Sequence, residues 1–277
     1  TSLKERMLSD GSFEELPQSA CNDMNECVFE KMEPGTEEGI TPAVRSCARG
    51  TLFDNFGRKQ FIDVAEGRLS LDDFMAQLND DDLLHLLGGQ PNVGVSNTFG
   101  FGNLPDYGVP SIMTADGPAG LRISGECSMN TTAWPCATLL ACTWNPTLVQ
   151  QVGQAGAEEV KENNLAVWLT PAVNIHRNPL CGRNFEYYSE DPLIAGKMGA
   201  AMVKGIQSQH IAASVKHFAA NNKETNRKHS DSRVSERALR EIYLKGFEII
   251  VKEAQPWTIM SSYNAINGHR ASENREL

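Results

Sequence analysis

The first candidate binding residue is Asp116, in the run Thr114-Ala-Asp-Gly-Pro-Ala-Gly-Leu-Arg122. A carboxylate followed by Gly-Pro has a fixed loop behind it and can accept two hydroxyl hydrogen bonds in a preset geometry. The same carboxylate could instead form an Asx turn or cap a helix. Arg122 could hold Asp116 or reach a ligand hydroxyl, so the run is a candidate ligand-binding segment.

A second polar segment, residues 178–192, places Arg183 between a predicted strand and the start of a helix. The guanidinium is a planar group with five donors, suited to neighbouring hydroxyls or to orienting a carboxylate. Gly182 would let the backbone approach a ligand closely. The segment could equally be a loop held by salt bridges.

Lys216 and His217 end the apolar run 212–218. Burying a lysine without a partner is costly, and the polar residues that follow, up to Arg227, are hard to explain by packing, so a binding role is favoured. Adjacent residues of a strand point to opposite faces, so both can reach one ligand only where the strand ends or bulges. Tyr263, after the run 259–262, could donate a hydrogen bond to a carboxylate or serve in packing.

Alternating helices and strands must position these residues from residue 70 onward. Asn145-Pro146 and Asp191-Pro192 each combine a capping side chain with proline at the first helical position, which predicts helices to about residues 163 and 209. Further helices are expected at residues 70–88 and from Ser235, and strands at 109–113, 165–169, 211–218 and 257–262.

Near-continuous apolar strands between amphipathic helices predict an α/β fold with parallel strands buried on both faces. Two architectures fit, a doubly wound open sheet and a (β/α)8 TIM-type barrel. No Gly-x-Gly-x-x-Gly fingerprint or P-loop is present, and the distinctive polar residues follow strand ends, where barrels place their active sites. A barrel is therefore predicted, incomplete because about five strand–helix units precede Leu277.

Composition excludes several other classes of protein. A formal charge of -10 without a basic run argues against nucleic-acid binding, and no apolar run approaches the length of about 18 residues that spans a membrane. Seven irregularly spaced cysteines favour reduced thiols and a cytoplasmic location. The histidines outside the Lys-His pair have no spacing typical of a metal site.

The chain divides by composition near residue 68. Residues 1–68 are predicted to be a linker or flanking segment, acidic at first, with a short strand or helix near residues 52–62. Residues 69–277 are predicted to form the partial barrel domain.

Six sequence blocks together resemble the N-terminal barrel domain of family-3 glycoside hydrolases of the β-glucosidase type, over roughly residues 70–277. One block alone would be weak, but six in the expected order are specific. The blocks are Asp-Gly-Pro-Ala-Gly-Leu-Arg (116–122), Trp-Pro-Cys-Ala-Thr-Leu-Leu-Ala (134–141), Gly-Arg-Asn-Phe-Glu-Tyr-Tyr-Ser-Glu-Asp-Pro (182–192), Lys-His-Phe-Ala-Ala-Asn-Asn-Lys-Glu-Thr-Asn-Arg (216–227), Ser-Glu-Arg-Ala-Leu-Arg-Glu-Ile-Tyr-Leu (235–244) and Met-Ser-Ser-Tyr-Asn (260–264).

The resemblance implies a retaining β-glucosidase that needs no metal or organic cofactor and acts on β-glucosides or gluco-oligosaccharides, as in cellobiose degradation. It places Tyr263 beside the nucleophile. The nucleophilic aspartate and the acid/base glutamate are expected beyond Leu277. The remaining domains of the same enzyme are therefore the expected partners. The resemblance is also compatible with a homo-oligomer. The residues implied to bind the glucosyl unit are Asp116, Arg122, Arg183, Lys216, His217 and Arg227.

The sequence bears on three other functions. A β-N-acetylhexosaminidase of the family would continue the Lys-His block with Pro-Gly-His-Gly-Asp, which this chain lacks. A β-xylosidase stays open, since one hydroxymethyl group separates the two substrates. A non-catalytic carbohydrate-binding protein that keeps only the sugar ligands also stays open.

Overall fold

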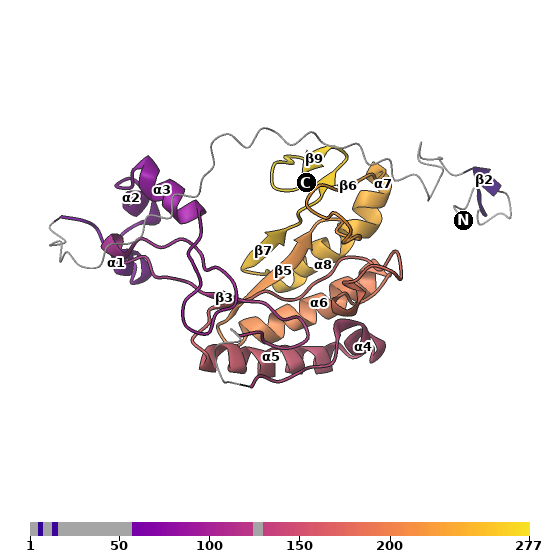
Figure 1. The fold of residues 1–277 in the computed structure, drawn as a ribbon, viewed down its shortest axis with the longest axis horizontal. Coiled ribbons are helices and arrows are strands. Elements are labelled where there is room, and N and C mark those ends of the chain that lie inside the picture. Colours follow the sequence, from indigo (N-terminus) through magenta and orange to yellow (C-terminus); the bar gives the residue numbers. More distant parts are fainter. Residues whose placement is uncertain (1–4, 8–12, 16–56, 124–129) are drawn as a thin grey trace.

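The computed structural model describes residues 5–7, 13–15, 57–123 and 130–277. A sheet of four parallel strands forms the centre, and its strands are neighbours in the order in which they occur in the chain (Figure 1). These strands are β3 (Thr114–Ala115), β4 (Val167–Trp168), β5 (Ala212–Phe218) and β7 (Thr258–Ser261). All but the last residue of β5 are buried, as the predicted apolar run requires.

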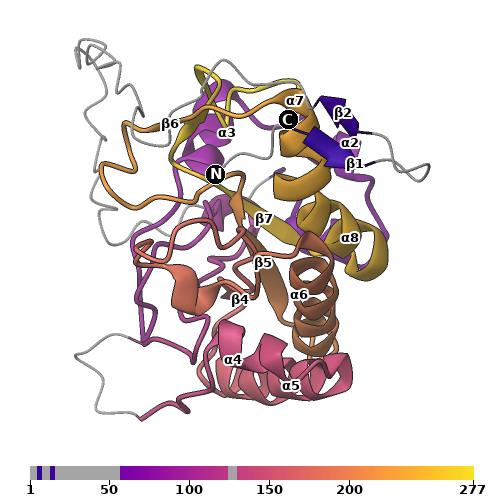
Figure 2. The same ribbon diagram turned by 90° about the vertical axis from the view of Figure 1, so that its right-hand side faces the viewer.

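The helices that connect the strands lie on the same side of the sheet, with α6 packed between α5 and α8 (Figures 1 and 2). A doubly wound sheet would reverse its strand order and carry helices on both faces. The predicted TIM-type class is therefore confirmed, and the described residues supply four of its strands rather than about five. The helices here are α4 (Ala137–Cys142), α5 (Pro146–Glu162), α6 (Pro192–Gln207), α7 (Glu236–Ala238) and α8 (Lys245–Ala254).

Both predicted cap–proline pairs begin helices. The Asn145 side chain accepts a hydrogen bond from the Leu148 N–H at 3.1 Å, and Asp191 accepts from the Leu193 N–H at 2.7 Å. These caps satisfy N–H groups that the first turn of a helix leaves unpaired. None of the described helices is long and apolar enough to cross a membrane.

Three predicted elements differ from those in the structure. Residues 109–113 are not a strand, because Val109 pairs with Leu104 across a turn, and β3 begins after them. The helix expected at 70–88 is two helices, α2 (Leu71–Met75) and α3 (Asp80–Leu87), because Asn79 and Asp82 form a capping box that starts a new one. The helix from Ser235 is interrupted by a π-helical turn at Leu239–Tyr243.

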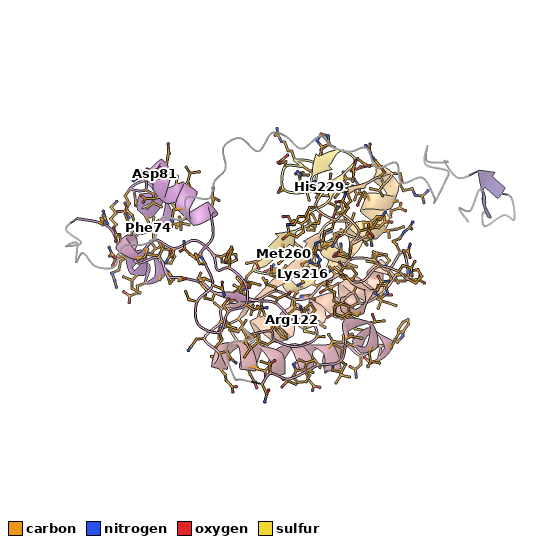
Figure 3. The ribbon with its side chains drawn as sticks, in the orientation of Figure 1. Phe74, Asp81, Arg122, Lys216, His229 and Met260 are labelled. Carbon is orange, nitrogen blue, oxygen red and sulfur yellow. The ribbon has the colours of Figure 1, made fainter. Side chains whose placement is uncertain are left out.

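A small helical group lies apart from the parallel sheet and its helices and has its own apolar cluster (Figure 3). In it Phe61, from α1 (Phe61–Ala65), packs edge-on against the buried Phe74 at a ring-centroid distance of 5.5 Å. The short helix η1 (Pro105–Tyr107) adds Tyr107. The boundary at residues 68 and 69 stays a prediction. Of the segment expected near 52–62, residues 52–56 lie outside the described residues, as does most of the flank; β1 (Glu5–Met7) and β2 (Phe13–Glu15) pair antiparallel within it.

A second, three-stranded sheet joins the loops that follow β5 and β7. It consists of β6 (Asp231–Ser232), β8 (Ala265–Ile266) and β9 (His269–Arg270). Ser232 Oγ donates to the Ala220 carbonyl at 2.9 Å, and Asn264 Nδ2 donates to the Ala219 carbonyl at 3.2 Å. The Asn264 bond joins the two loops at the carboxyl end of the strands, and the Ser232 bond holds the loop after β5 against its own start.

Trp168 of β4 links helix α5 to the loop after β3. Its ring is 1% exposed, and Gly156 of α5 lies against it so closely that a Cβ there would be 2.4 Å from Cη2. Its Nε1–H donates to the Gly117 carbonyl at 3.1 Å, next to Asp116. The packing of α5 therefore supports the loop that carries Asp116.

Substitution of Gly156 by alanine is expected to lower the free energy of unfolding by about 1–3 kcal/mol, because the buried indole must move. This holds although alanine favours a helix over glycine by about 1 kcal/mol. Urea unfolding of Gly156→Ala and wild type measures the difference.

Gly246→Ala is the matched control in α8, where the nearest atom to a new Cβ is the Pro192 carbonyl oxygen at 3.6 Å, an ordinary contact. It should be neutral or stabilising. Equal behaviour of the two variants would show that the Trp168 ring is not confined as described.

Candidate functional site

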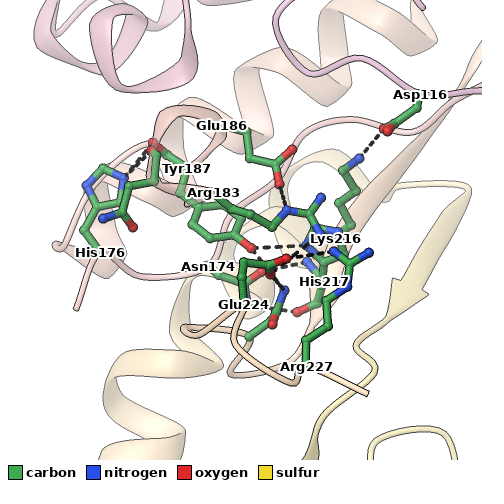
Figure 4. Close-up of polar contacts among 12 residues, drawn as sticks. Asp116, Asn174, His176, Arg183, Glu186, Tyr187, Lys216, His217, Glu224 and Arg227 are labelled. Atoms are coloured by element: carbon green, nitrogen blue, oxygen red, sulfur yellow. Dashed lines mark hydrogen bonds and ion pairs between the residues drawn. The ribbon is translucent and has the colours of Figure 1, made fainter. Parts of the chain in front are cut away.

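The predicted site residues lie together at the carboxyl ends of the parallel strands. Asp116 follows β3, Lys216 and His217 end β5, and Tyr263 follows β7. Arg183 and Arg227 reach the same region from the loops after β4 and β5, and Figure 4 shows their polar contacts. This placement is the one that a barrel gives to its ligand-binding groups.

Lys216 and Asp116 form an ion pair at the base of the site. Lys216 Nζ lies 2.5 Å from Asp116 Oδ1, and the lysine side chain is 2% exposed. Arg122 Nη1 lies 3.8 Å from the other oxygen of Asp116, and the Asp116 N–H donates to Asn97 Oδ1 at 3.0 Å. Burial raises the pKa of Asp116, but the charge of Lys216 and its hydrogen bond outweigh this and hold the pKa below its usual value. Asp116 is therefore an ionised acceptor at neutral pH.

An irregularity in β5 brings two adjacent side chains into the site. The register with β7 shifts between Lys216 and Phe218. Asn174 fixes the backbone here, since its Oδ1 accepts from the His217 N–H and its Nδ2 donates to the His217 carbonyl, both at 2.9 Å. The condition set by the sequence, a strand that ends or bulges at this pair, is met.

His217 is buried beside Tyr187, whose hydroxyl lies 3.4 Å from His217 Nδ1. Burial, followed by the positive charges of Arg183, Lys216 and Arg227, lowers the pKa of His217 to about 2. The ring is therefore neutral, with one nitrogen that donates and one that accepts.

Two glutamates that sequence reasoning did not select hold the arginines. Arg183 Nε donates to Glu186, which is 3% exposed, and Arg183 Nη1 lies 3.9 Å from Glu224 Oε1. Arg227 Nη1 donates to Glu224 Oε2 at 2.8 Å. Burial disfavours the charged form of Arg183, but the hydrogen bond and charge of Glu186 raise its pKa. The only sequence signal was that each glutamate lies three residues from an arginine.

The turn that carries Arg183 is anchored from behind. In η2 (Asn184–Glu186) and just after it, the carbonyls of Asn184 and Tyr187 each lie 2.9 Å from His176 Nε2. Thr138 Oγ1 of α4 donates to the same two carbonyls at 3.0 and 2.9 Å. His176, which the sequence assigned no metal role, is a structural histidine that holds this turn.

Tyr263 lies at the rim, with its ring 5.3 Å from the Arg227 guanidinium carbon and its side chain 56% exposed. Within residues 57–123 and 130–277 no group of three or more His, Cys, Asp or Glu residues could hold a metal ion. Three of the cysteines in that part of the chain, Cys136, Cys142 and Cys181, are free thiols.

Residues 103–277 match the family model described as the glycosyl hydrolase family 3 N terminal domain. The chain belongs to glycosyl hydrolase family 3. It is 58% identical, over its whole length, to β-glucosidase A of Butyrivibrio fibrisolvens, and spans 34% of that relative's length. It is 52% identical, over 61% of the chain, to exo-α-(1→6)-L-arabinopyranosidase of Bifidobacterium longum, and spans 24% of that protein.

Solved family-3 structures have the same fold. β-Glucosidase 3B of Thermotoga neapolitana in complex with α-D-glucose superposes with a TM-score of 0.72 at 47% identity, over 76% of this chain and 31% of that one. A β-glucosidase from Paenibacillus barengoltzii gives a TM-score of 0.76 at 44% identity, over 81% of this chain and 25% of that one.

The charges of this family-3 site nearly balance, since each carboxylate is paired with a cation of the protein. Such a site offers many fixed hydrogen-bond donors with little net field, which suits a neutral polyhydroxylated ligand better than an ion. The cations are Arg122, Arg183, Lys216 and Arg227, and the carboxylates are Asp116, Glu186 and Glu224.

The neutral state of His217 makes stability depend on pH. A histidine in the unfolded chain has a pKa near 6.5, so below that pH it is protonated. His217 in the folded protein stays neutral there, and protonation therefore stabilises the unfolded state relative to the folded one. This contribution to stability is complete above about pH 6.5 and is lost as pH falls toward 2. We expect the free energy of unfolding to fall between pH 6.5 and 5 by up to about 1.4 kcal/mol per pH unit from this residue.

Urea unfolding at several pH values measures that slope in wild type and in His217→Gln, which should lack this part of it. His229→Gln, at an exposed histidine, is the control and should keep the wild-type slope. A slope unchanged in His217→Gln would contradict a neutral His217.

Proposed function

We propose that the chain is the sugar-binding barrel of a β-glucosidase, which removes terminal non-reducing β-D-glucosyl residues with retention and acts as part of a longer or split polypeptide. The observation that carries the proposal is the cluster at the strand ends, in which Asp116, partly buried and paired with the buried Lys216, lies at the same end of the strands as the donors His217, Arg183 and Arg227. The identity with a β-glucosidase over the whole chain and the glucose-bound relative support it.

In this proposal the site holds one pyranose ring through its hydroxyls. Asp116 is ionised and can accept from two hydroxyls, while Lys216, Arg183 and Arg227 donate. His217, being neutral, can donate or accept. Arg122 completes the set near Asp116, and Tyr263 lies beside the nucleophile.

The carboxylates of the cluster do not fit the two catalytic roles of a retaining enzyme. The general acid of such an enzyme needs a raised pKa, whereas the pKa of Asp116 is lowered. Glu186 and Glu224 are engaged by arginines. We therefore propose that the acid/base glutamate and the nucleophilic aspartate lie outside this cluster, as the resemblance to the family implies.

A second candidate is the hydrolysis of α-L-arabinopyranosides. It is favoured by the relatives of that activity, at 52% and 51% identity over 61% of the chain. The residues proposed to hold the ring would serve any pyranose whose hydroxyls meet them, so the choice of sugar is tested directly.

The complete polypeptide is expected to release nitrophenol from the β-D-glucoside with a higher kcat/KM than from the β-D-xyloside or the α-L-arabinopyranoside. The 277-residue chain alone should show negligible turnover. Lys216→Met should reduce kcat/KM on the glucoside by a factor of about 30–1000, because it removes a charged donor and leaves Asp116 with only the more distant Arg122 as a cation partner.

Lys197→Met is the matched control, since Lys197 forms an exposed ion pair with Glu253 on the outer helices. It should retain kcat/KM within about twofold. A higher kcat/KM on the arabinopyranoside or the xyloside would show that the proposed substrate is wrong. Binding of glucose without turnover by the complete polypeptide would indicate a carbohydrate-binding protein.

A further inference from the structure

Glu224 is the one carboxylate of the cluster that contacts two of the arginines. Its Oε2 accepts from Arg227 Nη1 at 2.8 Å, and its Oε1 lies 3.9 Å from Arg183 Nη1. The same Oε1 accepts from Asn221 Nδ2 at 3.2 Å. Both oxygens are therefore engaged by protein donors, and the side chain is 24% exposed.

The two arginines depend on Glu224 to different degrees. Arg183 is held on two sides, because Glu186 binds its Nε while Glu224 lies near its Nη1. The Arg227 side chain is 37% exposed, and its guanidinium contacts Glu224 and the Tyr263 ring. A free arginine carries about 2 kcal/mol of rotamer entropy, so an unanchored Arg227 would lose that freedom on binding a ligand.

Glu224 also reaches the neutral histidine through one intermediate pair. Asn221 Nδ2 donates both to Glu224 Oε1 and to the Tyr187 hydroxyl, at 3.2 and 3.3 Å. The Tyr187 hydroxyl in turn lies 3.4 Å from His217 Nδ1, and the tautomer of the histidine decides which of the two donates. The carboxylate thus lies at the end of a chain of hydrogen bonds that runs to the ligand side of the site.

We propose that Glu224 is a positioning residue, which aligns Arg227, Arg183 and, through Asn221 and Tyr187, His217 for the hydroxyls of the sugar. The inference rests on the proposed function, since it takes these donors to be the sugar ligands. Glu224 acts through them and leaves the bond-breaking step to other groups. Its removal should therefore weaken sugar binding more than it slows the chemical step.

Glu224→Gln tests this without changing the size of the side chain. Glutamine has one acceptor oxygen, and its NH2 group would face a guanidinium, so it cannot serve Arg227 and Arg183 together. In the complete polypeptide we expect KM for the nitrophenyl β-glucoside and the Kd of glucose to rise about ten- to a hundredfold, with kcat changed less. Glucose binding is measured by titration calorimetry and is independent of turnover.

Glu253→Gln is the matched control, because it removes a carboxylate from an exposed ion pair with Lys197 on the outer helices. It should leave KM and Kd within about twofold. The thermal midpoint of Glu224→Gln is recorded alongside. If binding weakens only in proportion to loss of folded protein, the role is structural and the proposal fails.

A double-mutant cycle separates action through the arginine from direct contact. If Glu224 acts mainly through Arg227, then Glu224→Gln should weaken glucose binding much less in an Arg227→Met background than in wild type. Equal effects in both backgrounds would overturn the proposal, as would unchanged KM and Kd in the single variant.

These outcomes are distinct from failure of the proposed function. A wild-type polypeptide that binds glucose but hydrolyses no glycoside would refute the hydrolase assignment, while the Kd of the variants would still decide the role of Glu224. A wild type that neither binds glucose nor hydrolyses glycosides would refute both.

Discussion

The ion pair between the buried Lys216 and the partly exposed Asp116 is the constraint on which the rest of the site depends. Its partners come from β5 and from the loop after β3, which lie on either side of β4, so it closes the carboxyl end of three strands. Removing Asp116 would leave the buried charge of Lys216 without this partner, and breaking a buried pair in this way costs about 3–5 kcal/mol. Trp168 of β4 supports the arrangement, because it anchors the Gly117 carbonyl beside Asp116 and packs against α5. The geometry of the site therefore depends both on the order of the strands and on the packing of α5 against the sheet.

The same logic applies to the outer parts of the site, where long cationic side chains become useful only when the protein holds them. Glu186 and Glu224 hold Arg183, and the turn that carries Arg183 is pinned by His176 and Thr138 through backbone carbonyls. Donors fixed before the ligand arrives lose little entropy on binding. The loops after β5 and β7 are in turn joined by the small sheet β6–β8–β9, which helps to hold the residues that these loops contribute to the site.

Sequence reasoning found the elements whose signals are local. A capping side chain followed by proline defines a helix start by its own hydrogen bond, and both Asn145 and Asp191 behaved as expected. It misplaced the strand at 109–113, because an apolar run fits any buried segment and Val109 instead closes a turn with Leu104. Glu186 and Glu224 were missed because an acidic residue three positions from an arginine looks like an ordinary loop ion pair, and only the fold shows which such pairs face a ligand.

His217 is neutral because it is buried and because three cations surround it. Its neutral state decides which hydrogen bonds the site can offer a ligand. A protonated histidine would add a further positive charge next to Arg183, Lys216 and Arg227 in a region shielded from water, and burial together with those charges prevents it. The neutral ring keeps one accepting nitrogen, so a hydroxyl can meet either a donor or an acceptor there. A site made only of cations would favour anions. By pairing its cations with internal carboxylates and keeping its histidine neutral, the chain presents hydrogen bonds in fixed directions with little net charge, and direction is what distinguishes one hydroxyl from another.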